Sequence, residues 1–445
     1  MRCPRIMIAA PASGSGKTLV TCGILQALVN RGLKTASFKC GPDYIDPMFH
    51  SRIIGTRSKN LDAFFLGEND LKYIFSASAE GYDISVIEGV MGFYDGIKVD
   101  SSEASSYDVS MKTDTPAVLL IDCRGASLSV LPIIKGFLEY RKNNIRGVIF
   151  NRMSEKVFRM IKPEAEKMGV RAIGYVPKVN DLVLESRHLG LVLPGEVDNL
   201  KEKLNRLADI LEKTLDIDAL IALAEDAPEI SAEPPSVPAA AGKTRIGLAD
   251  DDAFCFIYED NIGILERMGA EIVRFSPLND PGLPDVDGII LPGGYPELHA
   301  KELEDNASMR ADIKAKLDGG MPCMAECGGF MYLHTMMTDR ERMTYRMCGV
   351  IEGDSKNMNR LTRFGYATYR SKSSGLWCRG HEFHYWESDN CGDDWEAEKP
   401  SGMRYGCIHD SGSIIAGFPH MYYYSNPEFP AQFIGKCLEY RNKRS

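Results

Sequence analysis

The fold of the first half of the chain is decided by the stretch Ile6-Met7-Ile8-Ala9-Ala10-Pro11-Ala12-Ser13-Gly14-Ser15-Gly16-Lys17-Thr18. A short apolar run is followed by a glycine-rich segment, and then by an apolar helical stretch from Leu19 to Val29. This order predicts a buried strand, a loop and a helix. The glycines let backbone N–H groups turn inward, and the helix N-terminus adds positive partial charge, so the loop is suited to phosphate.

The residue types in this loop predict a nucleotide site for ATP and Mg²⁺. Lys17 is placed to meet β- and γ-phosphate oxygens as a catalytic group, and Thr18 can ligate Mg²⁺. The P-loop pattern G-x4-G-K-[ST] is incomplete, because Pro11 stands where its first glycine belongs. A glycine-rich turn that binds nothing is the alternative, but a lysine and a threonine at a helix start have no packing purpose. The expected nucleotide-binding residues are Ser13, Gly14, Ser15, Gly16, Lys17 and Thr18.

Short β-branched runs alternate with helical patterns in both halves of the chain, which predicts parallel sheets covered by helices on both faces. The expected strands are Arg5–Ala10, Lys34–Lys39, Ile84–Glu88, Ala117–Asp122, Gly147–Asn151, Ala172–Val176, Arg245–Ala249, Glu271–Phe275, Gly288–Leu291 and Pro322–Ala325. An amphipathic helical stretch covers 196–224. The segment 229–243 is rich in proline and alanine, which predicts a linker. We therefore expect two three-layer α/β/α domains, at 1–228 and 244–445.

Composition excludes several classes of protein. The 445 residues are 44% apolar and 26% charged, which is the balance of a globular protein with more than one domain. A formal net charge of −10 disfavours nucleic acid as a partner. We expect no membrane segment, because no run of 18 apolar residues occurs. Twelve dispersed cysteines without a signal peptide indicate free thiols in the cytoplasm, and their spacing argues against structural zinc.

Two loops that follow predicted strands carry carboxylates where a parallel sheet presents its ligand. Asp43 and Asp46 follow the second strand, whereas Glu88 ends the third and Asp95 lies in the loop after it. Mg²⁺ prefers oxygen ligands and keeps several waters, so one or two carboxylates suffice. Glu88 is the first choice of metal ligand beside Thr18, and Asp43 the second. A helix cap or turn former is the alternative role for each carboxylate.

In the second half, the sequence predicts a cysteine nucleophile at a strand-to-helix junction. Cys327 follows the strand Pro322–Ala325 and precedes an apolar helical run, which is the layout of a nucleophile elbow. A helix N-terminus there would favour the reactive thiolate. The N–H groups of Gly294 and Gly328 can form an oxyanion hole, and His420 is the candidate base. A buried structural thiol and a packed histidine are the alternatives.

Taken together, these motifs resemble the family of cobyrinate a,c-diamide synthase and nickel-sirohydrochlorin a,c-diamide synthase along nearly the full chain. The first half resembles the dethiobiotin-synthetase-like branch of P-loop enzymes, and the second a class I glutamine amidotransferase with a flavodoxin-like fold. The motifs that carry the resemblance are Ser13-Gly14-Ser15-Gly16-Lys17-Thr18, Gly41-Pro42-Asp43-Tyr44-Ile45-Asp46-Pro47, Glu88-Gly89-Val90-Met91-Gly92, Arg187-His188-Leu189-Gly190-Leu191, Pro292-Gly293-Gly294-Tyr295-Pro296-Glu297, Glu326-Cys327-Gly328-Gly329 and Gly380-His381-Glu382-Phe383-His384-Tyr385.

The resemblance implies a ligase of cobalamin biosynthesis that amidates the a and c acetates of a tetrapyrrole. ATP would convert each carboxylate into an acyl phosphate, and glutamine would supply the ammonia. The expected partners are therefore the polycarboxylated tetrapyrrole, glutamine and ATP. The residues implied for substrate or intermediate binding are Asp43, Tyr44, Asp46, Asp95, Arg187 and His188. An anionic substrate also requires a local basic patch, for which the candidates are Lys39, Arg187, Arg360 and Arg363.

The surroundings of His420 depart from the family. The family usually shows a tyrosine-leucine-histidine-leucine-histidine run, of which this chain keeps only the first histidine. Other class I amidotransferases place a glutamate two residues after that histidine, where this chain has Tyr422. The group that orients His420 is therefore open.

Several alternatives for the whole protein also stay open. Nickel-sirohydrochlorin a,c-diamide synthase and cobyric acid synthase are the enzyme alternatives. A P-loop ATPase switch with a non-hydrolytic C-terminal domain is the alternative from another class. Pro11 and Ala12 argue against that switch, which would need a further lysine at the loop start. The central metal and the oligomeric state, including a homodimer, are not set by the sequence.

Overall fold

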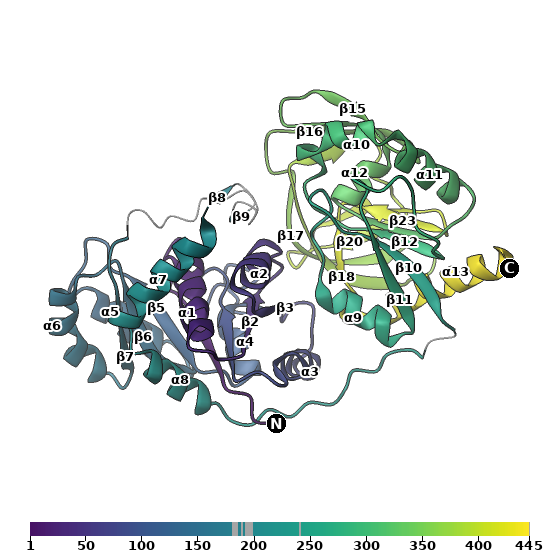
Figure 1. Ribbon diagram of the computed structural model, residues 1–445. Helices are drawn as coiled ribbons and strands as arrows, with labels where there is room; N and C mark the ends of the chain where they lie inside the picture. Colours follow the sequence, from purple (N-terminus) through teal and green to yellow (C-terminus); the bar gives the residue numbers. More distant parts are fainter. Residues whose placement is uncertain (180–185, 188–189, 192–198, 240–241, 445) are drawn as a thin grey trace. The chain divides into compact units, whose positions relative to one another are not determined.

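The computed structural model describes residues 1–179, 186–187, 190–191, 199–239 and 242–444. The chain forms two compact units, Met1–Pro235 and Ser236–Ser445 (Figure 1). The first residues of the expected linker belong to the first unit, because Ile230 donates its N–H to Met1 and Glu233 bonds to Asn69.

The first unit is built on a seven-stranded parallel sheet with the order β3-β2-β4-β1-β5-β6-β7. Its strands are β1 (Arg5–Ala9), β2 (Thr35–Cys40), β3 (Arg57–Leu61), β4 (Ile84–Glu88), β5 (Ala117–Asp122), β6 (Ile145–Asn151) and β7 (Arg171–Val176). The buried β1 lies between β4 and β5, so the loop that follows it opens at the carboxyl edge of the sheet near its centre.

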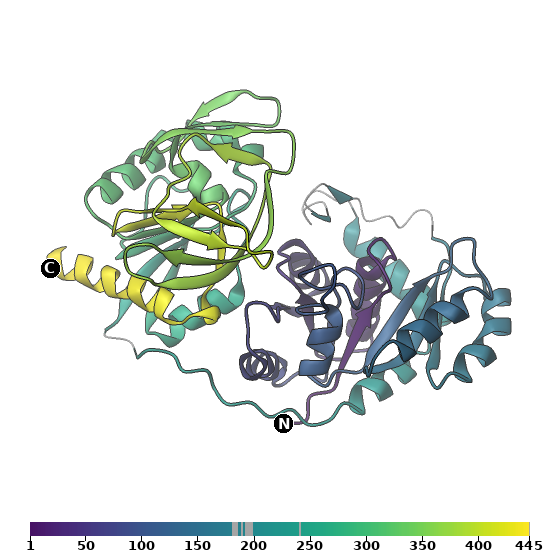
Figure 2. The same cartoon turned by 180° about the vertical axis from the view of Figure 1, so that it is seen from behind.

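Helices cover both faces of this sheet (Figures 1 and 2). They are α1 (Lys17–Asn30), α2 (Ile45–Met48), α3 (Glu68–Ala79), α4 (Ser106–Lys112), α5 (Val130–Glu139), α6 (Glu155–Glu166), α7 (Leu200–Thr214) and α8 (Ile217–Glu225). A π-helix, Phe49–Ile54, follows α2, and the short strands β8 (Ser186–Arg187) and β9 (Gly190–Leu191) pair with each other. The amphipathic helical stretch expected at 196–224 contains α7 and α8, its first three residues lying outside the described ranges, and the side chain of Asp216 begins α8 by accepting the N–H of Ala219.

The second unit contains a six-stranded sheet with the order β11-β10-β12-β13-β23-β22. Its strands are β10 (Thr244–Ala249), β11 (Ala270–Phe275), β12 (Gly288–Leu291), β13 (Cys323–Glu326), β22 (His409–Asp410) and β23 (Ile414–Gly417). All neighbours are parallel except β22, which pairs antiparallel with β23. The helices of this unit are α9 (Glu259–Arg267), α10 (Ala300–Asp305), α11 (Ala307–Asp318), α12 (Gly328–Leu333) and α13 (Glu428–Arg444), with 3₁₀ turns at Pro296–Leu298 and Tyr423–Ser425.

Two further sheets in this unit were not expected from the sequence. One has the order β15-β14-β16-β19 and the other β21-β20-β17-β18-β24. Their strands are β14 (His334–Thr338), β15 (Thr344–Arg346), β16 (Ile351–Asn357), β17 (Arg363–Ser371), β18 (Trp377–His384), β19 (Trp386–Ser388), β20 (Trp395–Glu398), β21 (Arg404–Cys407) and β24 (His420–Tyr422). Because β24 carries His420, the second of these sheets helps to position the site.

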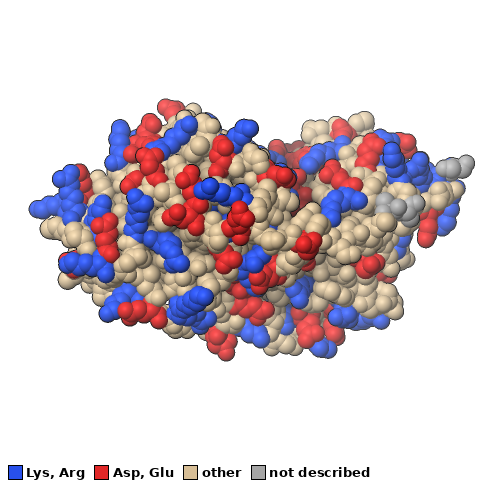
Figure 3. Space-filling model, turned by 90° about the horizontal axis from the view of Figure 1, so that it is seen from below, with Lys and Arg blue, Asp and Glu red and all other residues tan. Residues whose placement is uncertain are grey.

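The described surface carries charges of both signs. Lys and Arg lie interspersed with Asp and Glu over the face drawn in Figure 3. Among the residues that the structure describes, none of the helices combines the length and the apolar character needed to cross a bilayer. All twelve cysteines are free thiols, and Cys391 alone among them is not buried.

Candidate active sites

The glycine-rich loop of the first unit joins β1 to α1 and has a backbone that only glycine adopts easily. Gly14 and Gly16 have φ angles of +76° and +93°. A Cβ on Gly16 would lie 2.6 Å from Nδ2 of Asn151, which donates to the carbonyl oxygen of Ser15 over 2.7 Å. Asn151 at the end of β6 therefore fixes the loop from a neighbouring strand. Sequence reasoning missed this residue.

Lys17 is buried, and its Nζ donates to the carbonyl oxygen of Met91 over 2.6 Å. Burial and the nearby Lys39 lower the pKa of Lys17 to about 8, against the opposing effect of three carboxylates. An anionic phosphate in the loop would favour the charged form of this side chain. The ammonium group is therefore placed to respond to a bound nucleotide.

Glu88 ends β4 and is completely buried at the start of α1. Its Oε1 accepts the hydroxyl of Thr18 over 2.6 Å and Nζ of Lys39 over 2.8 Å, and its Oε2 lies 3.4 Å from Nε2 of His50. Burial acts to raise the pKa of Glu88, but Lys39 and His50 outweigh it and hold this pKa below its usual range. Glu88 is thus an anionic acceptor beside the phosphate loop.

The two carboxylates of α2 and its approach differ in what they contact. Oδ2 of Asp46 lies 3.4 Å from the Thr18 hydroxyl and pairs with Lys39. Oδ1 of Asp43 instead accepts the backbone N–H groups of Ile45 and Asp46, at 2.9 and 3.1 Å. Burial and the neighbouring Asp43 raise the pKa of Asp46 well above its usual value. The sequence suggested Asp46 only for substrate binding, but its carboxyl group lies beside Thr18. The carboxyl group of Asp43 caps the turn instead.

The donor set at this edge fits Mg²⁺. Thr18, Glu88 and Asp46 bring a hydroxyl and two carboxylates together, and Mg²⁺ is commonly held by one or two carboxylates plus phosphate oxygens and waters. Across the described ranges, no group of three or more His, Cys, Asp or Glu side chains could hold a metal ion by itself.

The remaining residues expected to bind substrate are only partly brought together. Tyr44 is buried at the start of α2, and Asp95 accepts the N–H of Gly92 over 3.0 Å. Arg187 lies in β8 with a side chain that is not described, and His188 lies outside the described residues. The expected basic patch loses Lys39, because that side chain is buried and paired with carboxylates. Arg360 is exposed, and the guanidinium of Arg363 stacks 4.3 Å from the ring centre of Tyr405.

In the second unit, Cys327 lies on a sharp turn between β13 and α12. Its φ and ψ angles are +46° and −103°, an unfavourable conformation for a residue with a side chain, and its N–H donates to Gly417 over 2.8 Å. Burial, together with Glu297, raises the pKa of the Cys327 thiol. The thiolate expected from the helix terminus is therefore not favoured in the resting site, so this nucleophile requires a base.

Gly293 brings Cys327 and His420 next to each other. A Cβ on Gly293 would lie closer than 3.0 Å to Cε1 of His420, and 3.4 Å from Cβ of Cys327. His420 pairs with His381 across β24 and β18, and the two rings stack with centres 4.9 Å apart. Burial, followed by His381 and His384, lowers the pKa of His420 well below its usual value. His420 is therefore a neutral imidazole that can accept a proton.

The two glycines expected to form the oxyanion hole lie in touching backbone segments. A Cβ on Gly328 would lie 3.1 Å from the backbone nitrogen of Gly294, whereas a Cβ on Gly294 would overlap the carbonyl oxygen of Ala253. Side chains are thus excluded from both positions. Gly328 is the first residue of α12 and directly follows Cys327, so the backbone of Gly294 lies close to the turn that carries the cysteine.

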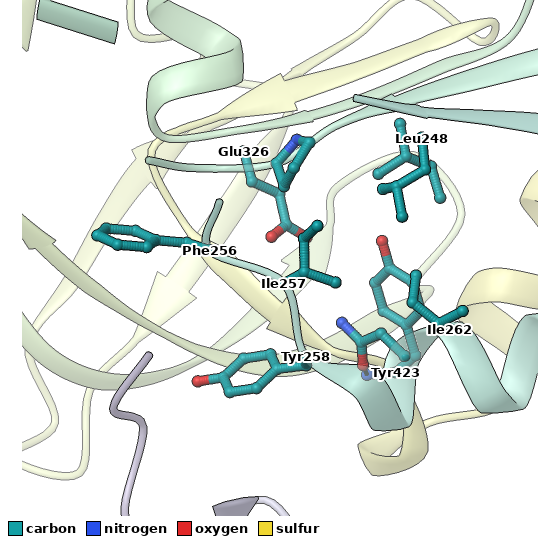
Figure 4. Close-up of a pocket in the computed structure, with 10 residues that line it drawn as sticks. Leu248, Phe256, Ile257, Tyr258, Ile262, Glu326 and Tyr423 are labelled. Atoms are coloured by element: carbon teal, nitrogen blue, oxygen red, sulfur yellow. Dashed lines mark hydrogen bonds between the residues drawn. The ribbon is translucent and has the colours of Figure 1, made fainter. Parts of the chain in front are cut away.

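Glu326 is a further residue of this site that sequence reasoning did not assign. Its Oε1 accepts the N–H of Met421 over 3.2 Å, and its Oε2 lies 3.8 Å from Nδ1 of His420. Its carboxyl end borders a cavity of about 20 Å³ and lies beside Ile257 (Figure 4). Burial raises the pKa of Glu326 to about 8, against the opposing effect of the Met421 N–H. Its position directly before the cysteine was the only sequence signal for it.

Comparisons with known proteins match both units. Residues 6–192 match a CobQ/CobB/MinD/ParA nucleotide binding domain, and residues 245–428 a CobB/CobQ-like glutamine amidotransferase domain. The cobyrinate a,c-diamide synthase of Listeria innocua is 38% identical, with 97% of this chain and 99% of the relative covered. That of Picrophilus torridus is 38% identical, with coverages of 98% and 99%. A crystal structure of a glutamine amidotransferase aligns with 43% of this chain and 98% of its own, at 13% identity and a TM-score of 0.32.

The two family models match the two halves of the chain in sequence order, at residues 6–192 and 245–428. A nucleotide-binding domain followed by a glutamine amidotransferase domain is the domain pair of a glutamine-dependent amidoligase. The chain belongs to the cobyrinate a,c-diamide synthase family.

Proposed function

We propose that this protein catalyses the ATP-dependent amidation of the a and c acetate groups of cobyrinate, with glutamine as the nitrogen donor. The observation that carries the proposal is the presence of two separately built sites on one chain. One is a phosphate loop with Lys17, Thr18 and Glu88, and the other joins Cys327 to His420 across Gly293. Relatives named cobyrinate a,c-diamide synthase match nearly the full length and supply the substrate class.

The first site activates the carboxylate. A carboxylate resists ammonia because its carbon is electron-rich and oxide is a poor leaving group. Transfer of the γ-phosphoryl group of ATP to a carboxylate oxygen yields an acyl phosphate with a good leaving group, and positioning with charge neutralisation accounts for most of the catalysis. Residues 13–18 cradle the phosphates, and Lys17 leaves the Met91 carbonyl to pair with them. Thr18, Glu88 and Asp46 would hold Mg²⁺, whose charge offsets that of the phosphates.

The second site produces ammonia from glutamine. His420 removes the thiol proton of Cys327, and the sulfur attacks the amide carbon while the N–H groups of Gly294 and Gly328 donate to the developing oxyanion. His420 returns the proton to the leaving ammonia. A water deprotonated by His420 then cleaves the thioester and releases glutamate.

This division of labour explains why the chain needs glutamine. Ammonia in neutral water is mostly ammonium, which has no lone pair with which to attack the acyl phosphate. Hydrolysis of glutamine releases the free base instead. Ammonia then attacks the acyl phosphate, phosphate leaves, and the amide is formed.

Replacement of the nucleophile tests the proposal. Cys327→Ala should abolish glutamine hydrolysis and glutamine-dependent synthesis, because no thioester can form. Synthesis should persist at high ammonium concentration and raised pH, where free ammonia is present. Product masses with cobyrinate and with nickel-sirohydrochlorin, assayed side by side, identify the tetrapyrrole.

Two results would contradict this assignment. Glutamine hydrolysis by the variant would place the nucleophile elsewhere. Loss of ammonium-dependent synthesis in a variant with wild-type circular dichroism would assign Cys327 to the synthetase chemistry instead.

A further inference from the structure

Tyr422 occupies the position where other class I amidotransferases carry the glutamate that orients the catalytic histidine. Its hydroxyl donates to Oδ2 of Asp260 over 2.9 Å, so Tyr422 is directed toward α9. Nδ1 of His420 instead faces the carboxyl group of Glu326. The carboxyl group beside His420 thus belongs to the residue directly before Cys327, and not to the residue two positions after His420.

We propose that Glu326 is the positioning residue of His420. The inference rests on the proposed roles of Cys327 and His420. The carboxyl group contacts the strand of the base at two successive residues, since one oxygen accepts the Met421 N–H and the other lies 3.8 Å from Nδ1 of His420. Such a distance is longer than a hydrogen bond, and catalytic hydrogen bonds often tighten only when substrate binds.

The backbone of Glu326 ties this contact to the nucleophile. Glu326 is the last residue of β13, where it pairs with Gly417 of β23, and the next residue, Cys327, donates its N–H to the same Gly417. His420 follows Gly417 by three residues. One short stretch of chain therefore fixes the nucleophile through its backbone and the base through its side chain.

The surroundings of Glu326 allow its carboxyl group to be either neutral or ionised. The cavity beside it has a volume of about 20 Å³, which is room for about one water molecule. Apolar side chains such as Leu248, Ile257 and Ile262 form much of its lining (Figure 4). The titratable groups that face Glu326 or the histidine beside it are Cys327, His420, Tyr258, Tyr423, Cys378, His381 and His384.

The substitution Glu326→Gln tests the orientation of His420 directly. The amide oxygen would take the place of Oε1, because the Met421 N–H requires an acceptor there. The amide NH₂ would then face Nδ1 of His420 and donate to it. That places the ring proton on Nε2, where it blocks the lone pair that must accept the thiol proton. In a serine-protease triad the corresponding wrong tautomer lowers kcat by about 10⁴-fold.

The experiment compares glutamine hydrolysis by wild type, Glu326→Gln and Tyr422→Phe. Glu326→Gln should lower kcat by at least about 100-fold with little change in KM, because positioning of the base is lost rather than substrate binding. Ammonium-dependent synthesis and the melting temperature should stay near wild type. Tyr422→Phe breaks the bond to Asp260 but should leave glutamine hydrolysis within a few-fold of wild type.

The pH dependence of kcat separates positioning from a structural role. In wild type, kcat should rise with pH as Glu326 ionises, since a carboxylate stabilises protonated His420 better than a carboxyl group does. Glu326→Gln should lack this rise. If Glu326→Gln has a lower melting temperature than wild type, Glu326→Asp is used instead. That variant should have a lower kcat but keep the increase of kcat with pH.

The outcomes distinguish this inference from the proposed function. Wild-type kcat and pH dependence in Glu326→Gln would overturn the role of Glu326, provided that Cys327→Ala has lost glutamine hydrolysis. A large loss in Tyr422→Phe together with an unaffected Glu326→Gln would assign the role to the Tyr422–Asp260 pair. Retained hydrolysis in Cys327→Ala would overturn the catalytic assignment itself.

Discussion

Substitution of Gly293 by alanine tests whether the backbone after β12 sets the geometry of the glutaminase site. The added Cβ would lie closer than 3.0 Å to Cε1 of His420, 3.3 Å from Nδ1 of His420 and 3.4 Å from Cβ of Cys327. The backbone itself accepts alanine, since Gly293 is not among the glycines with positive φ. The perturbation is therefore confined to the space between the two catalytic side chains.

The expected magnitude follows from the overlap. Carbon atoms pack at roughly 3.5–4.0 Å, so the imidazole ring must move by roughly 1 Å to accommodate the new methyl group. A misplacement of about 1 Å in a catalytic geometry can lower the rate about 100-fold. We therefore expect kcat for glutamine hydrolysis in Gly293→Ala to fall by about 100-fold.

The assay measures glutamate release and, separately, amide formation with ammonium. Gly293→Ala should keep its ammonium-dependent synthesis, because the perturbed atoms belong to the second unit. Gly263→Ala in α9 is the matched control, since its Cβ would meet nothing within 4 Å, and it should hydrolyse glutamine as wild type does. A folded Gly293→Ala with wild-type glutamine hydrolysis would refute the placement of His420 beside Cys327.

Two further predictions concern the first unit. Lys17→Ala should remove amide formation with either glutamine or ammonium, because the phosphates lose their buried cation before the nitrogen step; substantial ammonium-dependent product would contradict this role. Glu88→Gln should weaken Mg²⁺-dependent turnover by at least about tenfold, the scale expected when a metal ligand or its orientation is lost. Superimposable Mg²⁺ titrations of wild type and this variant would leave Glu88 as a structural strand end.

The parts of the fold that could be predicted are those with a local apolar signal. Strands such as β1 and β5 are continuous apolar runs, a pattern that indicates a strand of a parallel sheet buried on both faces. The edge strand β3 was missed because Arg57, Lys59 and Asn60 give it no apolar run. The added sheets give a similarly weak signal, since β16 (Ile351–Asn357) is largely polar, β20 (Trp395–Glu398) has only four residues, and both pair with strands distant in sequence.

The same difference applies to the candidate sites. The phosphate loop and the cysteine turn are contiguous in sequence, so their residues could be named before the structure. Asn151 contacts the loop from a strand more than 130 residues away in sequence, and Glu326 on β13 lies beside His420 on β24, a strand of a different sheet. Such pairings depend on the sheet order, which local patterns do not encode. Asp43 and Asp46 are close in sequence, but their side chains point in different directions. Asp43 caps the turn, whereas Asp46 lies beside Thr18.

The protonation states of the second site explain why the cysteine turn alone cannot make a reactive thiolate. Burial raises the pKa of Cys327 and lowers that of His420, so both side chains are neutral in the resting site. The N–H of Gly328, at the start of the six-residue helix that follows Cys327, favours the thiolate, but burial and Glu297 outweigh it. Formation of the thiolate and imidazolium pair is therefore uphill unless other groups stabilise the charges as they appear. In the proposed mechanism Glu326 would stabilise the imidazolium and the N–H groups of Gly294 and Gly328 the oxyanion, so we expect proton transfer and attack on glutamine to occur together rather than in sequence.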